Sequence, residues 1–215
     1  MKAKKLSFLF LGLFLTYSAL VLIGIFSETD QFITTAIQNN LTKAFDTPLS
    51  FLSLLGAFEV SVLLLLFIFL FQKFHHSLII FFMFSLGMGI ELLGKIFLYH
   101  PGPPKIFFRY NLDVIFPSAY VQTGHSFPSG HSYRTAFLAL LISYLIFQSK
   151  KLSPRSKKLL TAICFIFLFL MLVSRVSLGE HWTTDVIGGL FLGLGLAYLS
   201  IYLLENGFLE SNRLK

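Results

Sequence analysis

The amino-acid sequence predicts an all-α integral membrane protein, a bundle of six transmembrane helices with both termini in the cytoplasm. The first observation is composition, because 55% of the 215 residues are hydrophobic, only 13% are charged and the mean hydropathy is +0.77. A soluble domain of this size needs more polar side chains to cover its core. The second observation is a set of six apolar runs, each near the roughly 20 residues that cross a bilayer. The third is an uneven distribution of Lys and Arg between the loops.

The six runs leave little sequence for a soluble domain, so we expect one membrane domain over residues 1–215. The runs cover residues 7–26, 50–72, 77–99, 130–149, 159–179 and 183–205. The first follows MKAKK, which resembles the charged start of a secretory signal. Its apolar stretch exceeds the roughly 7–15 residues of a signal core, and no small-x-small cleavage site follows it. We therefore expect an uncleaved first helix.

The next part of the chain, residues 31–45, repeats apolar residues near every fourth position, which is typical of a helix that lies in the membrane interface. Such a helix guides a lipid headgroup or simply packs against the bundle. The second and third runs then contain two carboxylates, Glu59 and Glu91. Glu91 lies four residues before Lys95, so the two can pair on one helix face.

The last three runs begin or end at polar motifs. The fourth starts at Gly130 within FPSGHS and contains Arg134, the fifth ends just after Arg175, and the sixth starts after EHWTT. The single cysteine, Cys164, falls among Phe and Ile in the fifth run, where a packing role without a disulfide is expected.

The orientation follows from the basic residues outside the runs. Eleven lie at the termini, in the second-to-third loop and in the fourth-to-fifth loop, against three in the remaining loops. Cytoplasmic loops are enriched in Lys and Arg, so both termini are expected in the cytoplasm. The net charge of +7 is then an orientation signal and calls for no nucleic-acid partner.

Three basic residues fall inside the runs, namely Lys95, Arg134 and Arg175. An ionisable group in a membrane helix is costly unless it is paired or hydrated, so each is a candidate functional residue, with snorkelling toward the interface as the alternative. In the expected orientation, Lys95, Arg175 and the starts of the fourth and sixth runs all lie near the outer boundary of the bilayer. We therefore expect one polar cluster on the extracytoplasmic side.

The residue types in this cluster suit phosphate chemistry. A helix amino terminus opened by Ser129 and Gly130 offers unpaired N–H groups to an anion, and Lys and Arg add full charges. His181 and Asp185 are four residues apart, so the carboxylate can orient the imidazole for attack on phosphorus, although capping at an interface explains the spacing equally well. His131 would be free to protonate the departing alcohol.

The motifs resemble those of the type 2 phosphatidic acid phosphatase family, integral membrane lipid phosphatases that share their site with vanadium haloperoxidases. The family motifs read K-x6-R-P, P-S-G-H and S-R-x5-H-x3-D, and here the second is residues 128–131 and the third spans Ser174 to Asp185. The resemblance implies that His181 is the nucleophile that forms a phosphohistidine, that Asp185 orients it and that His131 is the general acid. It implies no metal or other cofactor. The phosphate oxygens are expected to be held by Lys95, Ser129, Gly130 and Arg175.

The first motif departs from the family pattern, because Gly102 stands where the family has Arg. His100, Arg109 and Arg134 are candidates to supply the missing charge. We favour Arg134, one turn below His131, because a bound phosphate would provide the counter-charge that an intramembrane arginine needs. The alternative is that Arg134 pairs with Glu59 or Glu91.

The function expected from the sequence is metal-independent hydrolysis of a lipid phosphate in the outer leaflet of a cell membrane, with a bacterial inner membrane favoured by the small size. Candidate substrates are phosphatidic acid, phosphatidylglycerophosphate and polyprenyl diphosphates. Three alternatives stay open: a phosphotransferase that uses the same intermediate, a non-catalytic protein that binds or transports lipid phosphates, and a zinc hydrolase built from His125, His131, His181 and Asp185. The sequence does not determine the oligomeric state.

Overall fold

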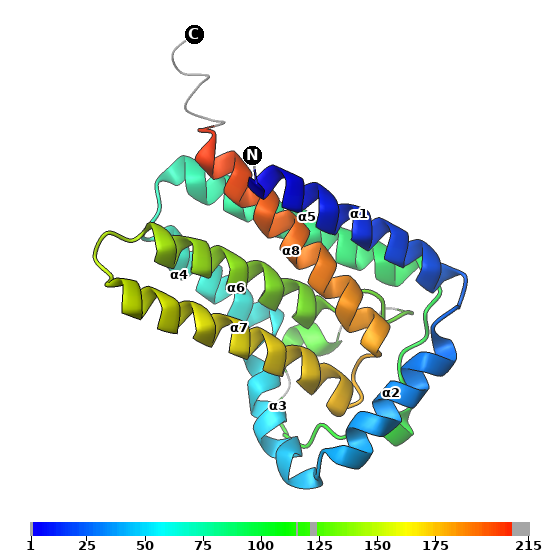
Figure 1. The fold of residues 1–215 in the computed structure, drawn as a ribbon. Helices are drawn as coiled ribbons and strands as arrows, with labels where there is room; N and C mark the ends of the chain where they lie inside the picture. Colours follow the sequence, from blue (N-terminus) through cyan, green and yellow to red (C-terminus); the bar gives the residue numbers. More distant parts are fainter. Residues whose placement is uncertain (1, 115, 121–123, 208–215) are drawn as a thin grey trace.

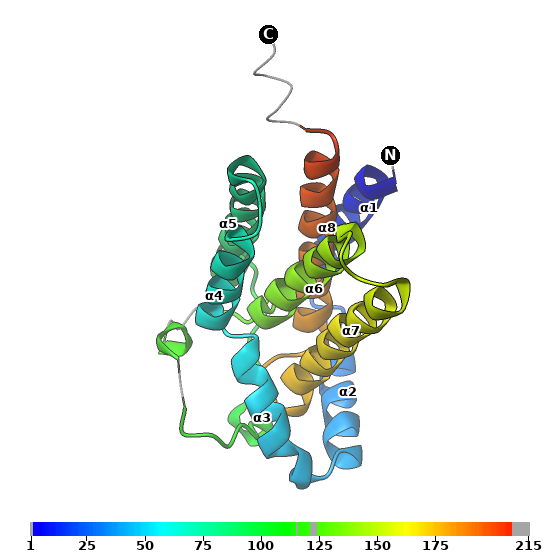
Figure 2. The same ribbon diagram turned by 90° about the vertical axis from the view of Figure 1, so that its left-hand side faces the viewer.

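The structure, a computed structural model, describes residues 2–114, 116–120 and 124–207, and this part of the chain contains helices and no strand (Figures 1 and 2). The α-helices are α1 (Lys2–Leu22), α2 (Ser27–Asn40), α3 (Asp46–Leu55), α4 (Phe58–Phe69), α5 (Phe74–Phe97), α6 (Gly130–Gln148), α7 (Pro154–Ser177) and α8 (Thr183–Glu205). Three short 3-10 helices are η1 (Lys43–Phe45), η2 (Lys105–Phe107) and η3 (Pro117–Tyr120).

Helix α8 lies at the centre of the bundle and packs against α1, α5 and α6, while α7 packs against the other side of α6 (Figure 1). The core between these helices consists of apolar side chains such as Phe84, Phe137, Leu141 and Leu192, each at most 1% exposed. The outward faces of α4, α5 and α7 carry exposed Phe, Leu and Ile, as expected for surfaces that lipid covers.

Two glycines of α8 allow α6 to approach closely. A Cβ atom at Gly189 would lie 2.3 Å from the carbonyl oxygen of Ser129, and one at Gly193 would lie 2.4 Å from that of Tyr133. The pair forms a G-x-x-x-G motif, which is typical of membrane helices whose backbones are in contact. This contact brings the first turn of α8 against the first turn of α6, where the backbone N–H of Ser129 donates to the carbonyl oxygen of Asp185 at 2.9 Å.

Four helices are long and apolar enough to cross a membrane, namely α1, α5, α7 and α8. The second expected run, residues 50–72, is not one straight helix: the residues from Lys43 to Leu55 and α4 meet at a break beside Gly56 with a bend of 48°, and they make a fifth candidate if taken as one span. Helix α6 corresponds to the fourth expected run and is not among these candidates. It is less apolar, because His131, Ser132 and Arg134 all lie in its first five residues.

The helix bounds differ from the expected ranges mainly at the amino-terminal ends. Helix α1 begins at Lys2, α5 at Phe74 and α7 at Pro154, each three to five residues before the apolar run. Ser153 caps α7, with its hydroxyl accepting the N–H of Ser156 at 3.1 Å, and Pro154 follows in the first turn. The polar first turn of α7 belongs to the helix through this cap, which an apolar window does not detect.

The first turn of α1 and the last turn of α8 lie at the same end of the bundle, and α2 and α3 lie at the opposite end (Figures 1 and 2). The ammonium group of Lys4 is 5.6 Å from the centre of the Tyr202 ring, which places these two ends side by side. The end of α5, the end of α7 and the starts of α6 and α8 gather at the other end, near α2 and α3.

Candidate active site

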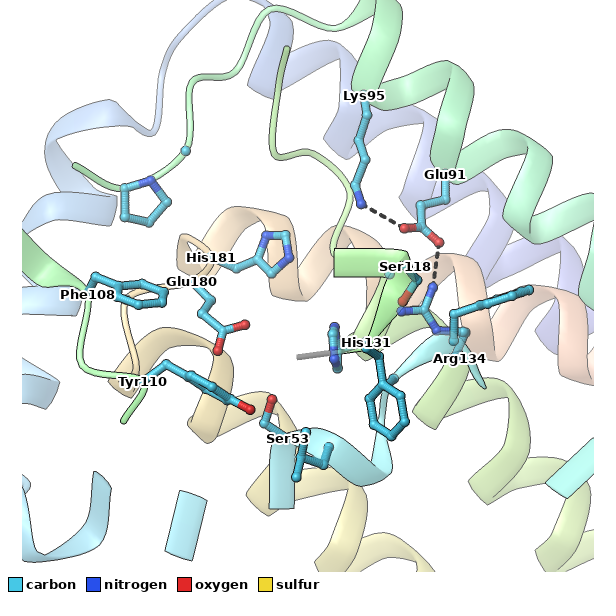
Figure 3. A pocket seen from close by; sticks show the side chains of 18 of the residues that line it. Ser53, Glu91, Lys95, Phe108, Tyr110, Ser118, His131, Arg134, Glu180 and His181 are labelled. Atoms are coloured by element: carbon cyan, nitrogen blue, oxygen red, sulfur yellow. Dashed lines mark hydrogen bonds and ion pairs between the residues drawn. The ribbon is translucent and has the colours of Figure 1, made fainter. Parts of the chain in front are cut away.

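A cavity of about 600 Å³ lies at this other end of the bundle, between α3, α5, α6 and the loop that joins α7 to α8. Its polar lining includes the side chains of Glu91, Lys95, His131, Arg134, Glu180 and His181. Figure 3 shows the two imidazoles and the Glu180 carboxylate in this space, with Lys95 and Arg134 on either side of Glu91. The cavity therefore brings together side chains that lie up to 90 residues apart in the sequence.

His181 precedes α8 and is held by the first turn of that helix. Its Nδ1 atom lies 3.2 Å from Oδ2 of Asp185, and the same carboxylate oxygen accepts the backbone N–H of Trp182 at 2.9 Å. Asp185 is fully buried. Because a carboxylate accepts, the hydrogen bond requires a proton on Nδ1, which leaves the lone pair of Nε2 free to act as a nucleophile or base.

His131 lies in the first turn of α6, which begins at Gly130 with Ser129 as the N-cap. The Ser129 hydroxyl accepts the N–H of Ser132 at 3.5 Å and is fully buried, so it lies behind the cavity wall. Gly130 and His131 line the cavity. A Cβ atom at Gly56 would lie 2.9 Å from Cδ2 of His131, so the break between α3 and α4 leaves room for the imidazole.

Lys95 and Arg134 share one carboxylate. Glu91 accepts from the Lys95 ammonium at 2.8 Å and from the Arg134 guanidinium at 3.0 Å, and all three side chains are less than one-fifth exposed. Of the two carboxylates considered as partners for Arg134, the structure places Glu91 against it, and Glu91 is also the partner expected for Lys95. Arg134 still lines the cavity, and its Nε atom donates to the carbonyl oxygen of Gly56 at 3.4 Å.

Arg175, in the last turn of α7, is fully buried and forms a two-pronged ion pair with Glu180. Glu180 lines the cavity, so Arg175 lies one layer behind it. Tyr110 lines the same wall, and burial together with the charge of Glu180 raises the pKa of its phenol. Any anion that binds Arg175 directly must replace Glu180.

The three candidates for the charge missing at Gly102 occupy different places. Gly102 itself lines the cavity, and a Cβ atom there would touch only Ser126 at ordinary contact distance. Arg109 instead pairs with Asp46 at 2.9 Å, and His100 lies behind Asp185, with its Nε2 atom 3.4 Å from Oδ1. Among the three candidates, only Arg134 lines this cavity.

His125, one of the ligands of the zinc alternative, stacks edge-on against Tyr99 with the ring centres 5.1 Å apart. The side chain of Trp182 is 9% exposed and donates from its indole to the carbonyl oxygen of Pro101 at 2.8 Å. Within the described residues, no three or more His, Cys, Asp or Glu side chains are arranged to hold a metal ion.

The sequence did not predict the positions of four polar side chains around the site, namely Asp30, His100, Glu180 and Thr184. Asp30 of α2 accepts from the N–H of Thr184 at 2.9 Å and from its hydroxyl, although α2 is more than 140 residues from α8 in the chain. Burial is the main cause that raises the pKa of Asp30, and the charge of Asp185 adds to it. The sequence gives no signal for this contact, because Asp30 lies in the polar stretch SETDQ.

Comparison with known proteins gives a consistent result. Residues 78–208 match the PAP2 superfamily, which is more than half of the chain. Phosphatidylglycerophosphatase B of Bacillus subtilis (strain 168) is 38% identical over 78 residues, which cover 36% of this chain and 38% of that protein. Phosphatidylglycerophosphatase B of Haemophilus influenzae is 38% identical over 85 residues, covering 36% and 34%. The chain thus spans little more than a third of the length of these curated relatives.

Two solved structures resemble most of this chain. The crystal structure of a transmembrane PAP2 type phosphatidylglycerolphosphate phosphatase from Bacillus subtilis has a TM-score of 0.76 at 25% identity, covering 96% of this chain and 98% of that chain. The crystal structure of Aquifex aeolicus LpxE has a TM-score of 0.58 at 23% identity, covering 80% and 94%. The second likeness shows the shared fold alone.

Proposed function

Since the chain belongs to the PAP2 superfamily, we propose that it is a membrane phosphatase that hydrolyses a phosphomonoester or diphosphate of a lipid. The observation that carries the proposal is the cavity in which His131, His181 and Lys95 meet, with Asp185 bonded to Nδ1 of His181. Phosphatidic acid, phosphatidylglycerophosphate and polyprenyl diphosphates are the candidate substrates. The names of the curated relatives favour phosphatidylglycerophosphate.

The proposed reaction has two steps. In the first, Nε2 of His181 attacks phosphorus, the bond between phosphorus and the lipid oxygen breaks, and protonated His131 gives its proton to that oxygen. In the second, His131 takes a proton from water, the water oxygen attacks phosphorus, and the phosphorus–nitrogen bond breaks to release phosphate. Asp185 holds the Nδ1 proton of His181 and stabilises the positive charge that the ring carries in the intermediate.

The phosphate oxygens are proposed to contact Lys95, Arg134 and Gly130 at the first turn of α6, and to reach Arg175 when Glu180 moves aside. Ser129, behind the cavity wall, is proposed to support the phosphate by capping α6. The unpaired N–H groups of a helix amino terminus favour an anion, and guanidinium groups bind phosphate in a fork. Both arginines already pair with carboxylates, so a substrate phosphate competes with Glu91 and Glu180 for them. This competition favours a substrate whose phosphate carries two negative charges.

A second cavity supports an amphiphilic substrate. It has a volume of about 650 Å³, lies between α4 and α5 and shares Phe58, Glu91, Lys95 and Ser118 with the first cavity. Apolar side chains of both helices point outward beside it, among them Leu63, Leu66 and Leu92. A lipid can place its phosphate in the first cavity while its tails remain at the apolar surface.

We place the protein in a bacterial cell membrane with six crossings, both termini in the cytoplasm and the site on the extracytoplasmic side. The excess of Lys and Arg in the termini and in the loop after α6 supports this orientation. The position of the first and last turns at one end of the bundle supports an even number of crossings. Helix α6 would be the fourth crossing along the chain and would complete the six, shielded from lipid by α7 and α8.

The test measures phosphate release by the purified protein in detergent from phosphatidic acid, phosphatidylglycerophosphate and an isoprenoid diphosphate. We expect turnover of at least one substrate in the presence of chelator, inhibition by vanadate, and loss of turnover in His181→Ala. Release that stops with chelator would favour a zinc hydrolase, and transfer to an added alcohol in place of water would favour a phosphotransferase. Binding without any release would favour a non-catalytic role.

A further inference from the structure

A buried network behind Asp185 carries a further inference. One oxygen of the Asp185 carboxylate, Oδ2, accepts from His181 and from the N–H of Trp182. The other, Oδ1, is buried and has no hydrogen bond in the described structure. A buried carboxylate oxygen without a donor is costly, so a nearby donor has a strong effect on this group.

His100 is the side chain that faces this second oxygen. Its Nε2 atom lies 3.4 Å from Oδ1 of Asp185, 3.0 Å from the hydroxyl oxygen of Thr184 and 3.6 Å from Oδ2 of Asp30. The Thr184 hydroxyl donates to Asp30 and therefore accepts from His100, which requires a proton on Nε2. That N–H is directed at Thr184, and Oδ1 of Asp185 lies 3.4 Å from the same nitrogen without forming a hydrogen bond.

The ring of His100 is fixed from several sides. The residue is 7% exposed, its carbonyl oxygen accepts the N–H and the hydroxyl of Ser126 at 2.9 and 3.0 Å, and its ring stands edge-on to Phe127. Asp30, 2% exposed on α2, holds Thr184 through two hydrogen bonds. His100 does not line the cavity, so it does not touch a substrate there.

We propose that His100 is a positioning residue that keeps the Asp185 carboxylate oriented toward His181, and that Asp30 supports His100 through Thr184. The inference rests on the proposed function, because its value is to hold the nucleophile in the reactive tautomer. Tyr17 of α1 is a further titratable side chain near both carboxylates. With His100 in place, Oδ1 of Asp185 has the imidazole Nε2 atom 3.4 Å away, Oδ2 stays bonded to His181, and His181 keeps its proton on Nδ1.

The first experiment compares His100→Phe, which keeps a ring but removes the donor, with His100→Gln, whose amide nitrogen can occupy the place of Nε2. We expect His100→Phe to lower kcat by roughly 10- to 100-fold with KM nearly unchanged, as for loss of a group that supports a catalytic one, and His100→Gln to recover most of it. The matched control is His76→Phe at the far end of α5, which should retain kcat within about twofold of the wild type.

A double variant separates positioning from simple loss of folding. His100→Phe combined with Asp185→Asn should be no slower than Asp185→Asn alone, because His100 acts through Asp185. Additive losses would overturn the proposal.

A second measurement needs no turnover. In nitrogen-15 histidine spectra of the protein in detergent, we expect His181 to carry its proton on Nδ1 in the wild type and in His100→Gln, and to lose this preference in His100→Phe. If that pattern appears but no lipid phosphate is hydrolysed by the wild type, the proposed function fails and this inference stands. If the wild type is active and His100→Phe retains both kcat and the His181 tautomer, the inference is wrong.

Discussion

Replacing Glu91 by Gln tests the central charge arrangement of the cavity. Glu91 accepts from Lys95 at 2.8 Å and from Arg134 at 3.0 Å, and its side chain is 11% exposed. At an effective dielectric constant of 20, each pair has a Coulomb energy of about 6 kcal/mol, most of which offsets the cost of taking the charges out of water. Removing one partner of a buried pair lowers the free energy of unfolding by about 3–5 kcal/mol. Glu91→Gln keeps one oxygen that can accept a hydrogen bond, so we expect a loss at the lower end, about 3 kcal/mol.

The measurement is thermal unfolding of the purified protein in detergent, with and without vanadate. For a chain of this length, a loss of about 3 kcal/mol lowers the Tm by roughly 6–12 °C. Vanadate at 100 times its Kd adds about 2.7 kcal/mol to the wild type. Vanadate should raise the Tm of Glu91→Gln by more than it raises that of the wild type. In the variant, Lys95 and Arg134 can bind the anion without first breaking their ion pairs with Glu91.

The control is Glu28→Gln, which removes an exposed carboxylate in the first turn of α2 and should change stability by less than about 1 kcal/mol. Two results would refute the reasoning. One is a Tm of Glu91→Gln within about 2 °C of the wild type, because the expected decrease in Tm is roughly 6–12 °C. The other is an equal stabilisation of both proteins by vanadate, which would mean that Glu91 and the anion do not compete.

Three further changes test other parts of the structure. His131→Asn should slow hydrolysis of a lipid phosphate by about 10²- to 10⁴-fold but affect p-nitrophenyl phosphate much less, since nitrophenolate leaves without a proton; equal losses would contradict the general-acid role. Gly193→Ala should cost about 1–3 kcal/mol in thermal unfolding, because its Cβ would lie 2.4 Å from the Tyr133 carbonyl oxygen, whereas Gly12→Ala, where nothing lies within 4 Å, should be neutral or stabilising. Burial raises the pKa of Asp30 from its ordinary value of 3.8, so the folded state favours the protonated form. The free energy of unfolding of the wild type should therefore decrease as the pH rises from 3.8 toward the raised pKa, and this decrease should be absent in Asp30→Asn. Unfolding measured across this pH range checks the prediction, and a decrease of the same size in both proteins would show that Asp30 is not the group responsible.

The sequence by itself determined the helical membrane character and the end of the bundle at which the polar groups gather. Apolar runs of about 20 residues can satisfy their backbone only as helices in lipid, so length and composition suffice for the helices. The spacing of His181 and Asp185 likewise predicts their contact, because side chains four residues apart meet on one helical turn. The structure has this contact at 3.2 Å.

Only the tertiary structure decided which charges neutralise which. Glu91 could have paired with Lys95 alone, and it also takes Arg134 from another helix. His100 could have faced the cavity, yet the chain turns it behind Asp185, where Asp30 of α2 completes the network through Thr184. Such pairs join side chains that are far apart in the sequence. Their geometry depends on how closely the helices pack, as at Gly189, where the absence of a side chain allows α8 to contact the backbone of Ser129.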